Sequence, residues 1–306
     1  MIQVNILECA RPLSEDGGMH ELSFDDWSPR ASDSQLAAAE AALENGGILY
    51  LPRLAFGLSE TETRYLSPRW SNEKRKNIAL RADESAPRGA VGDAADLAAL
   101  AAMLARFREH AESLVGALLP RYAKRMARAG TSFRPCEIEG RVSSWRKDDT
   151  RLHVDAFPSN PNRGLRILRV FSNVHPAKPR VWRVGEPFED MARRYLPKIP
   201  RPLPGSAWML ETLHITKTRR SEYDHLMLGL HDSVKADMGY QKDCPQQEIA
   251  FPPGCTWIVY TDQVMHAATS GQHAFEQTFH LPVAGLGRPE TSPLKVLEKL
   301  TGRALV

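Results

Sequence analysis

Long apolar runs are missing from this chain. Its richest stretches, residues 48–51 and 257–260, are only as long as a strand, whereas a helix that crosses a membrane needs about 18 consecutive apolar residues. This excludes a helical membrane span. Residues 1–12 also lack the cationic start and the continuous apolar segment of a secretory signal. We therefore expect the protein to stay in the cytoplasm.

Cysteine is scarce, and neither sign of charge dominates. The four cysteines lie far apart with no Cys-x-x-Cys pair, so we expect neither a disulfide framework nor a zinc ribbon. The 40 basic and 37 acidic side chains leave a net charge of +3. This balance does not favour a nucleic-acid partner. A composition of 42% hydrophobic and 25% charged residues is typical of a globular protein.

Helical patterns dominate the first third of the chain. An alanine-rich segment at residues 35–44 follows capping residues at 32–34 and stops at a Gly-Gly pair, after which residues 48–51 form a strand-like run. A second helix is predicted from Asp93 to Leu118 or Leu119, before Pro120. We expect further helices at residues 221–234 and 292–300. The last is amphipathic, and we expect it to dock against the body of the protein.

Short apolar runs separated by turn-forming residues follow from about Ile138. They predict strands at residues 141–145, 165–174, 207–212, 256–261 and 275–281. Such a series favours a mainly β fold with a jelly-roll core. We expect a single domain with a largely helical N-terminal cover (1–137), a jelly-roll core (138–291) that holds a helical insert near 221–234, and a C-terminal helix (292–306).

One group of residues has the pattern of a metal site. His153 and Asp155 form a His-x-Asp triplet, and on an extended strand their side chains point to the same face. The triplet alone often arises by chance. His266 follows 111 residues after Asp155, between strand-like runs. Two imidazoles and one carboxylate on one face, with three positions open, make up the facial triad of non-haem Fe(II) oxygenases.

The other histidines fit this pattern less well. They lie in turns, before a proline, at a strand end or outside the strand context of His266, so we expect surface or supporting positions for His175, His214, His225, His231, His273 and His280.

Three arginines, Arg163, Arg166 and Arg169, interrupt the apolar run that follows the triplet. Burying them is costly unless they meet an anion. In oxygenases that use 2-oxoglutarate, a cation pairs with the far carboxylate of this cosubstrate. Strand alternation puts Arg166 and Arg169 on opposite faces, and we assign the cosubstrate to Arg166. Alternatively, all three arginines pair with surface carboxylates such as those of Glu186 or Glu189.

In three segments the chain resembles the 3-deoxy-D-manno-oct-2-ulosonic acid (Kdo) hydroxylases, a family of Fe(II)- and 2-oxoglutarate-dependent dioxygenases. The segments are residues 144–158, which contain the triplet, residues 223–240, and residues 261–267, which contain His266. The first is specific to the family, whereas His-x-Asp with a distal His marks only the superfamily. The resemblance implies a double-stranded β-helix core in which His153, Asp155 and His266 bind ferrous iron, with 2-oxoglutarate and dioxygen as cosubstrates.

Related enzymes often carry the cosubstrate arginine about eleven residues after the distal histidine. In this chain that position is Gln277, which has no charge to offer. We therefore treat Gln277 as a cosubstrate-binding candidate and look for the cation elsewhere, at Arg166.

The resemblance also implies a substrate. The family reaction is hydroxylation of Kdo at C3 in the lipopolysaccharide inner core, which gives the sugar acid called Ko. Kdo linked to lipid A carries a carboxylate and phosphates, so we expect cations near the mouth of the site, and we assign this role to Arg146, Lys147, Arg180 and Arg183. Another basic cluster lies at Lys217, Arg219 and Arg220.

A lipid-linked substrate would place the enzyme at the cytoplasmic face of the inner membrane, in peripheral contact with it. Two alternatives remain open at this point. The same cofactor chemistry can act on another substrate, such as a peptide side chain, or a metal-binding jelly roll can serve as a carbohydrate-binding module without catalysis.

Overall fold

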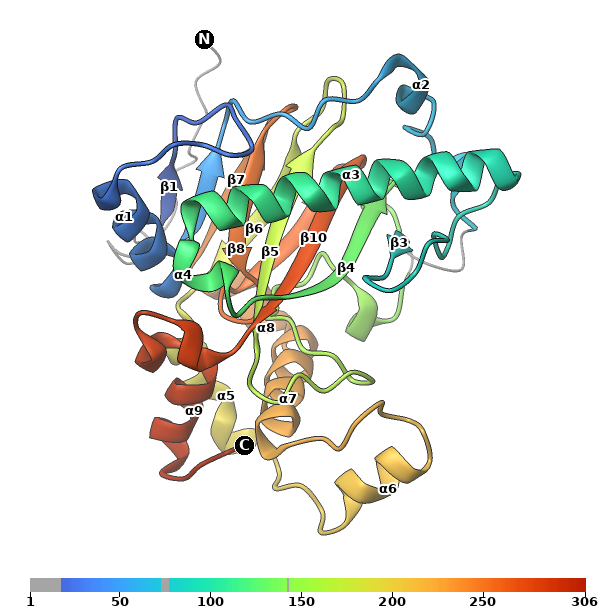
Figure 1. Cartoon of the computed structure of the whole chain (residues 1–306). Helices are drawn as coiled ribbons and strands as arrows, with labels where there is room; N and C mark the ends of the chain where they lie inside the picture. Colours follow the sequence, from blue (N-terminus) through green and yellow to red (C-terminus); the bar gives the residue numbers. More distant parts are fainter. Residues whose placement is uncertain (1–17, 73–76, 142) are drawn as a thin grey trace.

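A computed structural model describes residues 18–72, 77–141 and 143–306 (Figure 1). The prediction that residues 1–12 are no secretory signal lies outside these ranges. Within them, no helix has both the length and the hydropathy that a membrane crossing requires.

Two β-sheets form the centre of the protein. The larger sheet has seven strands in the order β1-β2-β8-β5-β10-β4-β3, and the smaller has three in the order β7-β6-β9. Neighbouring strands run antiparallel, apart from the parallel pair β1 and β2. The strands are β1 (Met19–Glu21), β2 (Ile48–Leu51), β3 (Ile78–Leu80), β4 (Ala127–Arg134), β5 (Arg166–Asn173), β6 (Arg180–Gly185), β7 (Gln246–Phe251), β8 (Thr256–Tyr260), β9 (His266–Ser270) and β10 (Ala274–Leu281).

Helices cover the outer face of the large sheet. They are α1 (Asp33–Glu44), α2 (Glu60–Thr63), α3 (Ala94–Leu118) and α4 (Pro120–Ala123), and α3 lies across the sheet (Figure 1). Asp93 caps α3 by accepting a hydrogen bond from the backbone of Asp96. Phe107 of α3 is fully buried against Phe275 of β10, a burial that contributes about 2 to 3 kcal/mol. This packing fixes the large sheet that carries part of the site.

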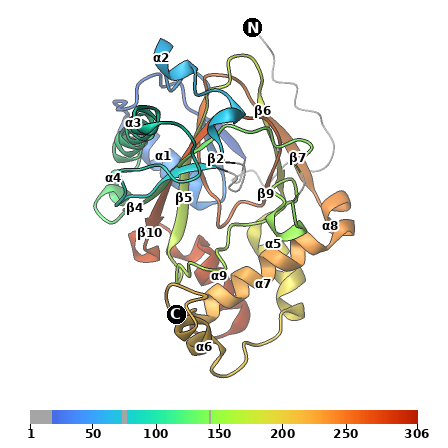
Figure 2. The ribbon, with the colours of Figure 1, turned by 90° about the vertical axis from the view of Figure 1, so that its right-hand side faces the viewer.

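A second group of helices gathers at one end of the two sheets (Figure 2). It comprises α5 (Phe188–Tyr195), α6 (Ser206–Thr212), α7 (Glu222–Ala236), α8 (Met238–Asp243) and α9 (Pro293–Thr301). Ser221 and Asp224 form a capping box at the start of α7. Leu230 of α7 and Leu297 of α9 are buried in one core with Leu152, so the expected docking of the last helix is confirmed.

The structure confirms the mainly β fold with helical cover, and four expectations differ in detail. Residues 207–212 form helix α6 instead of a strand, because they lack alternation and contain good helix formers. The described residues between 141 and 145 form no strand, and a 3-10 turn begins at Trp145. The N-terminal part is more than a cover, since it supplies β1 to β4. Strands β6, β7 and β9 were not predicted.

The two faces of β5 have different surroundings. Leu168 and Val170 belong to the core under the helices, whereas Phe171 packs against Trp182 of β6 in a core between the sheets. The candidate site lies on this inner side, between the large and the small sheet.

Candidate metal centre

The three predicted ligands come together between the sheets. One possible ligand atom from each of His153, Asp155 and His266 lies within 4.8 Å of the other two. His266 begins β9, and it exchanges two backbone hydrogen bonds with His153, of 3.0 and 2.9 Å. The backbone N–H of Asp155 donates to the carbonyl of Thr261 at 2.7 Å. The loop that carries the triplet is thus held against β9 and the end of β8.

Both imidazole rings are oriented for metal binding. Nδ1 of His153 lies 2.8 Å from the carbonyl oxygen of Arg151, and Nδ1 of His266 lies 2.8 Å from that of Val264. A carbonyl can only accept, so each Nδ1 carries the hydrogen and each Nε2 keeps its lone pair. Nε2 of His153 faces Oδ1 of Asp155 at 3.8 Å. With the hydrogen on Nδ1, each ring has its Nε2 lone pair available to bind a metal ion.

The protonation states suit a cation as well. Burial, and then the neighbouring His266, lower the pKa of His153 well below its usual value, and burial lowers that of His266. Burial alone would raise the pKa of Asp155, but the guanidinium of Arg169 holds it below its usual range. At neutral pH the site therefore presents two neutral imidazoles and one carboxylate, a donor set that suits ferrous iron.

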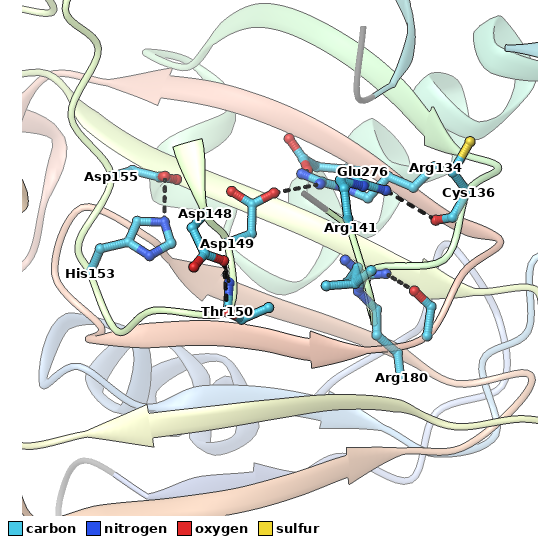
Figure 3. Close-up of polar contacts among 12 residues, drawn as sticks. Arg134, Cys136, Arg141, Asp148, Asp149, Thr150, His153, Asp155, Arg180 and Glu276 are labelled. Atoms are coloured by element: carbon cyan, nitrogen blue, oxygen red, sulfur yellow. Dashed lines mark hydrogen bonds and ion pairs between the residues drawn. The ribbon is translucent and has the colours of Figure 1, made fainter. Parts of the chain in front are cut away.

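Three arginines and Asp149 line the other side of a cavity of about 50 Å³ next to the triad. Arg169 joins Asp155 at 2.9 Å to Glu276 at 2.8 Å, and Arg134 contacts the second oxygen of Glu276 at 2.6 Å. Figure 3 shows His153 and Asp155 on one side, and Arg134, Glu276 and Arg180 on the other. The carboxylates of Asp155 and Glu276 balance Arg169 and Arg134.

Arg180 is the cation that remains without a carboxylate partner. Its side chain is buried, with 1% of its surface exposed, and it donates to the backbone carbonyl of Gly271 at 3.2 Å. It forms no ion pair with the described residues, and its Nε has no hydrogen-bond partner among them. Burial and the nearby Arg134 lower the pKa of Arg180 to about 9. A buried charge is costly when unpaired, so we expect an anion to bind next to Arg180.

Further donors around the cavity also lack acceptors. The buried Nε1 of Trp182 and Nε of Arg169 have no hydrogen-bond partner among the described residues, and both side chains line the cavity. The Trp182 ring stacks on His266 with centroids 5.1 Å apart. A bound carboxylate would satisfy several of these donors at once.

Arg166 lies on the opposite face of β5 and does not line this cavity. Its guanidinium pairs with Asp262 at 2.7 Å, donates to Gln263 at 2.6 Å and lies 3.8 Å from the centroid of the Tyr260 ring. The prediction that Arg166 anchors the cosubstrate therefore does not agree with the structure. The alternative pairing with Glu186 or Glu189 is not seen for Arg166 or Arg169 either, because these glutamates contact Arg194 and Arg193.

Gln277 also faces away from the cavity. Its side chain accepts from the hydroxyl of Thr131 at 2.5 Å and donates to the carbonyl of Thr278 at 2.7 Å. The preceding residue, Glu276, is the one whose side chain pairs with the cavity residues Arg134 and Arg169. As with Arg166, alternation along the strand decides which residue reaches the site.

The four predicted substrate cations are spread apart. Only Arg180 lines the cavity. Arg146 is largely exposed, pairs with Asp232 at 2.9 Å and stacks on Trp145, and Lys147 follows it in the same 3-10 turn. Arg183 is used structurally, since it donates to the carbonyl of Thr150 at 2.7 Å and to Gln246 at 3.0 Å.

Several residues of the site were not predicted from the sequence. Arg169 and Glu276 lie on neighbouring strands and contact each other on the inner face; alternation separates Arg169 from Arg166 but does not tell which of the two faces the site. His231 lies on α7 with its ring centroid 5.4 Å from that of His153, and it continues the buried stripe of Tyr223 and Met227 at four-residue steps. Nothing in the local sequence marks Arg134, which reaches the site through sheet pairing.

Comparisons with known proteins agree with this geometry. A family model described as 3-deoxy-D-manno-oct-2-ulosonic acid (Kdo) hydroxylase matches residues 26–304. The chain is similar to the crystal structure of the Kdo hydroxylase KdoO, a non-haem Fe(II) α-ketoglutarate-dependent dioxygenase, in complex with α-ketoglutarate and Fe(III). The identity is 45% and the TM-score 0.91, over 94% of this chain and 97% of that one.

A second KdoO structure, in complex with cobalt(II), has 46% identity and a TM-score of 0.92 over the same shares of the two chains. No curated protein sequence matches the chain.

Proposed function

The chain belongs to the Kdo hydroxylase family, and on this premise we propose that it hydroxylates Kdo with ferrous iron, 2-oxoglutarate and dioxygen. One observation carries the proposal: a triad of two neutral imidazoles and a carboxylate shares a cavity with a buried arginine that forms no salt bridge with any described residue. The triad suits the metal, and the arginine suits the anionic cosubstrate.

Each cavity residue has a definite task in this proposal. His153, Asp155 and His266 would hold the iron, which with 2-oxoglutarate bound supplies the oxidant that converts a C–H bond to C–OH, while 2-oxoglutarate becomes succinate and carbon dioxide. Arg180 would pair with the far carboxylate of 2-oxoglutarate. Its buried Nε and the Nε1 of Trp182 are free to donate to that anion.

Supporting residues keep the ligands in place. Arg169 holds the carboxylate of Asp155 and is itself held by Glu276, so the carboxylate stays ionised and its orientation is fixed. The carbonyls of Arg151 and Val264 fix the two rings. Phe171 and Trp182 form an apolar wall that excludes water from this side of the cavity.

The finer identity of the substrate is also part of the proposal. We infer that the enzyme acts at C3 of a Kdo residue linked to lipid A, gives Ko, and works at the cytoplasmic face of the inner membrane. Arg146 and Lys147 would contact this acidic lipid; the side chain of Arg146 is exposed, and it would exchange its surface ion pair with Asp232 for the lipid anion. We assign Arg180 to the cosubstrate instead of the lipid, and Arg183 to a structural role through its hydrogen bonds.

A direct assay tests the activity. The purified protein, loaded anaerobically with Fe(II), is mixed with 2-oxoglutarate, oxygenated buffer and Kdo-linked lipid A. We expect succinate and a Kdo residue heavier by one oxygen atom, and neither product from His266→Ala. Consumption of 2-oxoglutarate without any change in Kdo would instead indicate another substrate, such as a peptide side chain.

A further inference from the structure

An excursion of the chain between α5 and α7 projects from the rest of the protein. We call residues 200–219, which include α6, the α6 excursion. In two views at right angles it extends beyond the helices that gather at this end of the molecule (Figures 1 and 2). Its two ends are tied to the body, since the carbonyl of Pro200 meets Nε2 of His225 at 2.7 Å and the backbone N–H of Lys217 donates to Ser159 at 3.0 Å.

Exposed apolar side chains are concentrated on the α6 excursion. Of the nine large hydrophobic residues that are exposed in the described part of the chain, five lie here, with 50 to 77% of their surface in solvent. They are Leu203, Trp208, Met209, Leu213 and Ile215. Apolar groups gathered in this way on a surface mark a contact with another molecule or a membrane.

The helix presents its apolar side outward. Trp208 and Thr212 lie one turn apart, as do Met209 and Leu213, so these four residues share one face. All four are exposed, whereas Leu210 is half-buried. This is the reverse of an ordinary surface helix, whose apolar face packs on the core.

Basic residues flank this apolar face in the sequence. The α6 excursion contains Arg201, Lys217 and Arg219 against one acidic side chain, Glu211, and so carries a net charge of +2. Lys198 and Arg220, just outside it, raise the net charge of residues 198–220 to +4. Apolar side chains that include a Trp, bordered by Lys and Arg, are typical of segments that lie in the interface of an anionic membrane.

We propose that the α6 excursion docks the enzyme on an anionic lipid surface, with Trp208, Met209 and Leu213 entering the headgroup region. This inference deepens the proposed function and rests on it for the lipid-linked substrate. Charge complementarity favours an anionic surface as the occupant, because a second copy of the chain would bring two excursions of net charge +2 together, which repel each other. An anionic bilayer attracts the same surface, by about fivefold for each basic residue near it.

The α6 excursion is connected to the loop that carries a metal ligand. Besides the bond from Lys217 to Ser159, Arg220 donates to the carbonyl of Pro158 at 2.7 Å. Ser159 follows Asp155 by four residues, so their Cα atoms are at most about 14 Å apart. A sugar attached to a membrane lipid would thus be held near the metal centre while the α6 excursion contacts the bilayer.

Vesicle flotation of the full-length protein tests the docking. We expect wild type to float with vesicles of equal parts phosphatidylcholine and phosphatidylglycerol, and far less with phosphatidylcholine alone. The double variant Trp208→Ser/Leu213→Ser should bind the anionic vesicles at least tenfold more weakly. Met238→Ser is the matched control, because Met238 is equally exposed, at 58%, but lies outside the excursion, and its binding should not change.

A charge variant and an activity assay make the test decisive. Lys217→Gln/Arg219→Gln should weaken binding about twentyfold. Turnover of detergent-dispersed substrate should be the same in the Trp208→Ser/Leu213→Ser variant as in wild type. Vesicle binding without any hydroxylation would overturn the proposed function and leave the docking intact.

Other outcomes would overturn the docking itself. One is hydroxylation by a wild-type enzyme that does not float. Another is equal flotation of wild type and the Trp208→Ser/Leu213→Ser variant. If sedimentation shows that wild type is a dimer and that the Trp208→Ser/Leu213→Ser variant is a monomer, the apolar face is a contact between copies of the chain.

Discussion

Replacement of Arg180 by Gln tests how the cavity binds its anionic cosubstrate. If the guanidinium pairs with the far carboxylate of 2-oxoglutarate, the variant loses one member of a buried ion pair, which costs about 2 to 5 kcal/mol. At 1.4 kcal/mol per factor of ten, the KM for 2-oxoglutarate should rise at least about 30-fold. Iron binding should persist, because Arg180 contacts none of the three ligands through an ion pair or hydrogen bond.

The same variant should not be less stable without the cosubstrate. In the free protein Arg180 is buried, and among the described residues it bonds to one backbone carbonyl and forms no salt bridge. The more distant Glu276, Asp149 and Glu137 offset only part of the cost of this buried charge, which a neutral side chain does not have. We expect the free energy of unfolding in urea to stay constant or to increase. A loss of cosubstrate affinity with no loss of stability distinguishes a binding residue from a structural one.

Two assays and one control complete this test. Succinate formation gives the KM, and anaerobic titration of the Fe(II) enzyme with 2-oxoglutarate gives the affinity through the visible absorption of the chelate. Arg183→Gln is the control, since Arg183 lies on the same strand and bonds to Thr150 and Gln246; its KM should stay near that of wild type. An unchanged KM in folded Arg180→Gln would refute the reasoning and move the role to Arg134 or Arg169.

Three more predictions concern stability and metal binding. Burial, with His175 beside it, lowers the pKa of His273 to about 4, against about 6.5 in an unfolded chain. The folded state therefore binds this proton less readily, and stability that is present above pH 6.5 is lost as the pH falls. His273→Asn, which tolerates the positive φ of this position, should reduce the loss between pH 7.5 and 5.5 by about 1 kcal/mol in urea unfolding. Asp262→Asn leaves Arg166 buried without a charge partner and should destabilise the protein by about 3 to 5 kcal/mol in the same assay; a near-zero effect would contradict the structural role of this pair. Co(II) at 100 times its Kd should stabilise wild type by about 2.7 kcal/mol, seen as a higher Tm, and His266→Ala should lose this increase.

Local patterns in the sequence were enough to find the metal ligands and most long helices. The segment from Asp93 to Leu118 has a cap, a helical apolar period and a proline stop, and α3 follows it closely. His153, Asp155 and His266 were identified because their residue types, spacing and strand context already specify a metal site. The resemblance to the Kdo hydroxylases supplied the cofactors and the reaction.

The anion-binding side of the cavity depends on contacts that are distant in sequence. Arg166 and Arg169 are residues of the same type in the same apolar run, and only the packing of β5 between two cores shows that Arg169 faces inward. Arg180 belongs to a strand that was not predicted, because two arginines interrupt its apolar alternation. Its significance comes from its burial without a salt bridge and from an Nε that has no hydrogen-bond partner among the described residues, and both features require the folded structure.

Labelled dioxygen tests the central claim most directly. The Fe(II) enzyme is given 2-oxoglutarate, Kdo-linked lipid A and dioxygen labelled with the heavy isotope of oxygen, and the Kdo residue is analysed by mass spectrometry. We predict that Kdo gains one labelled oxygen atom at C3 for each succinate formed, and that Asp155→Ala shows neither product. Kdo that stays unlabelled while succinate accumulates would contradict the proposed substrate, and a folded enzyme that forms no succinate would contradict the proposed chemistry.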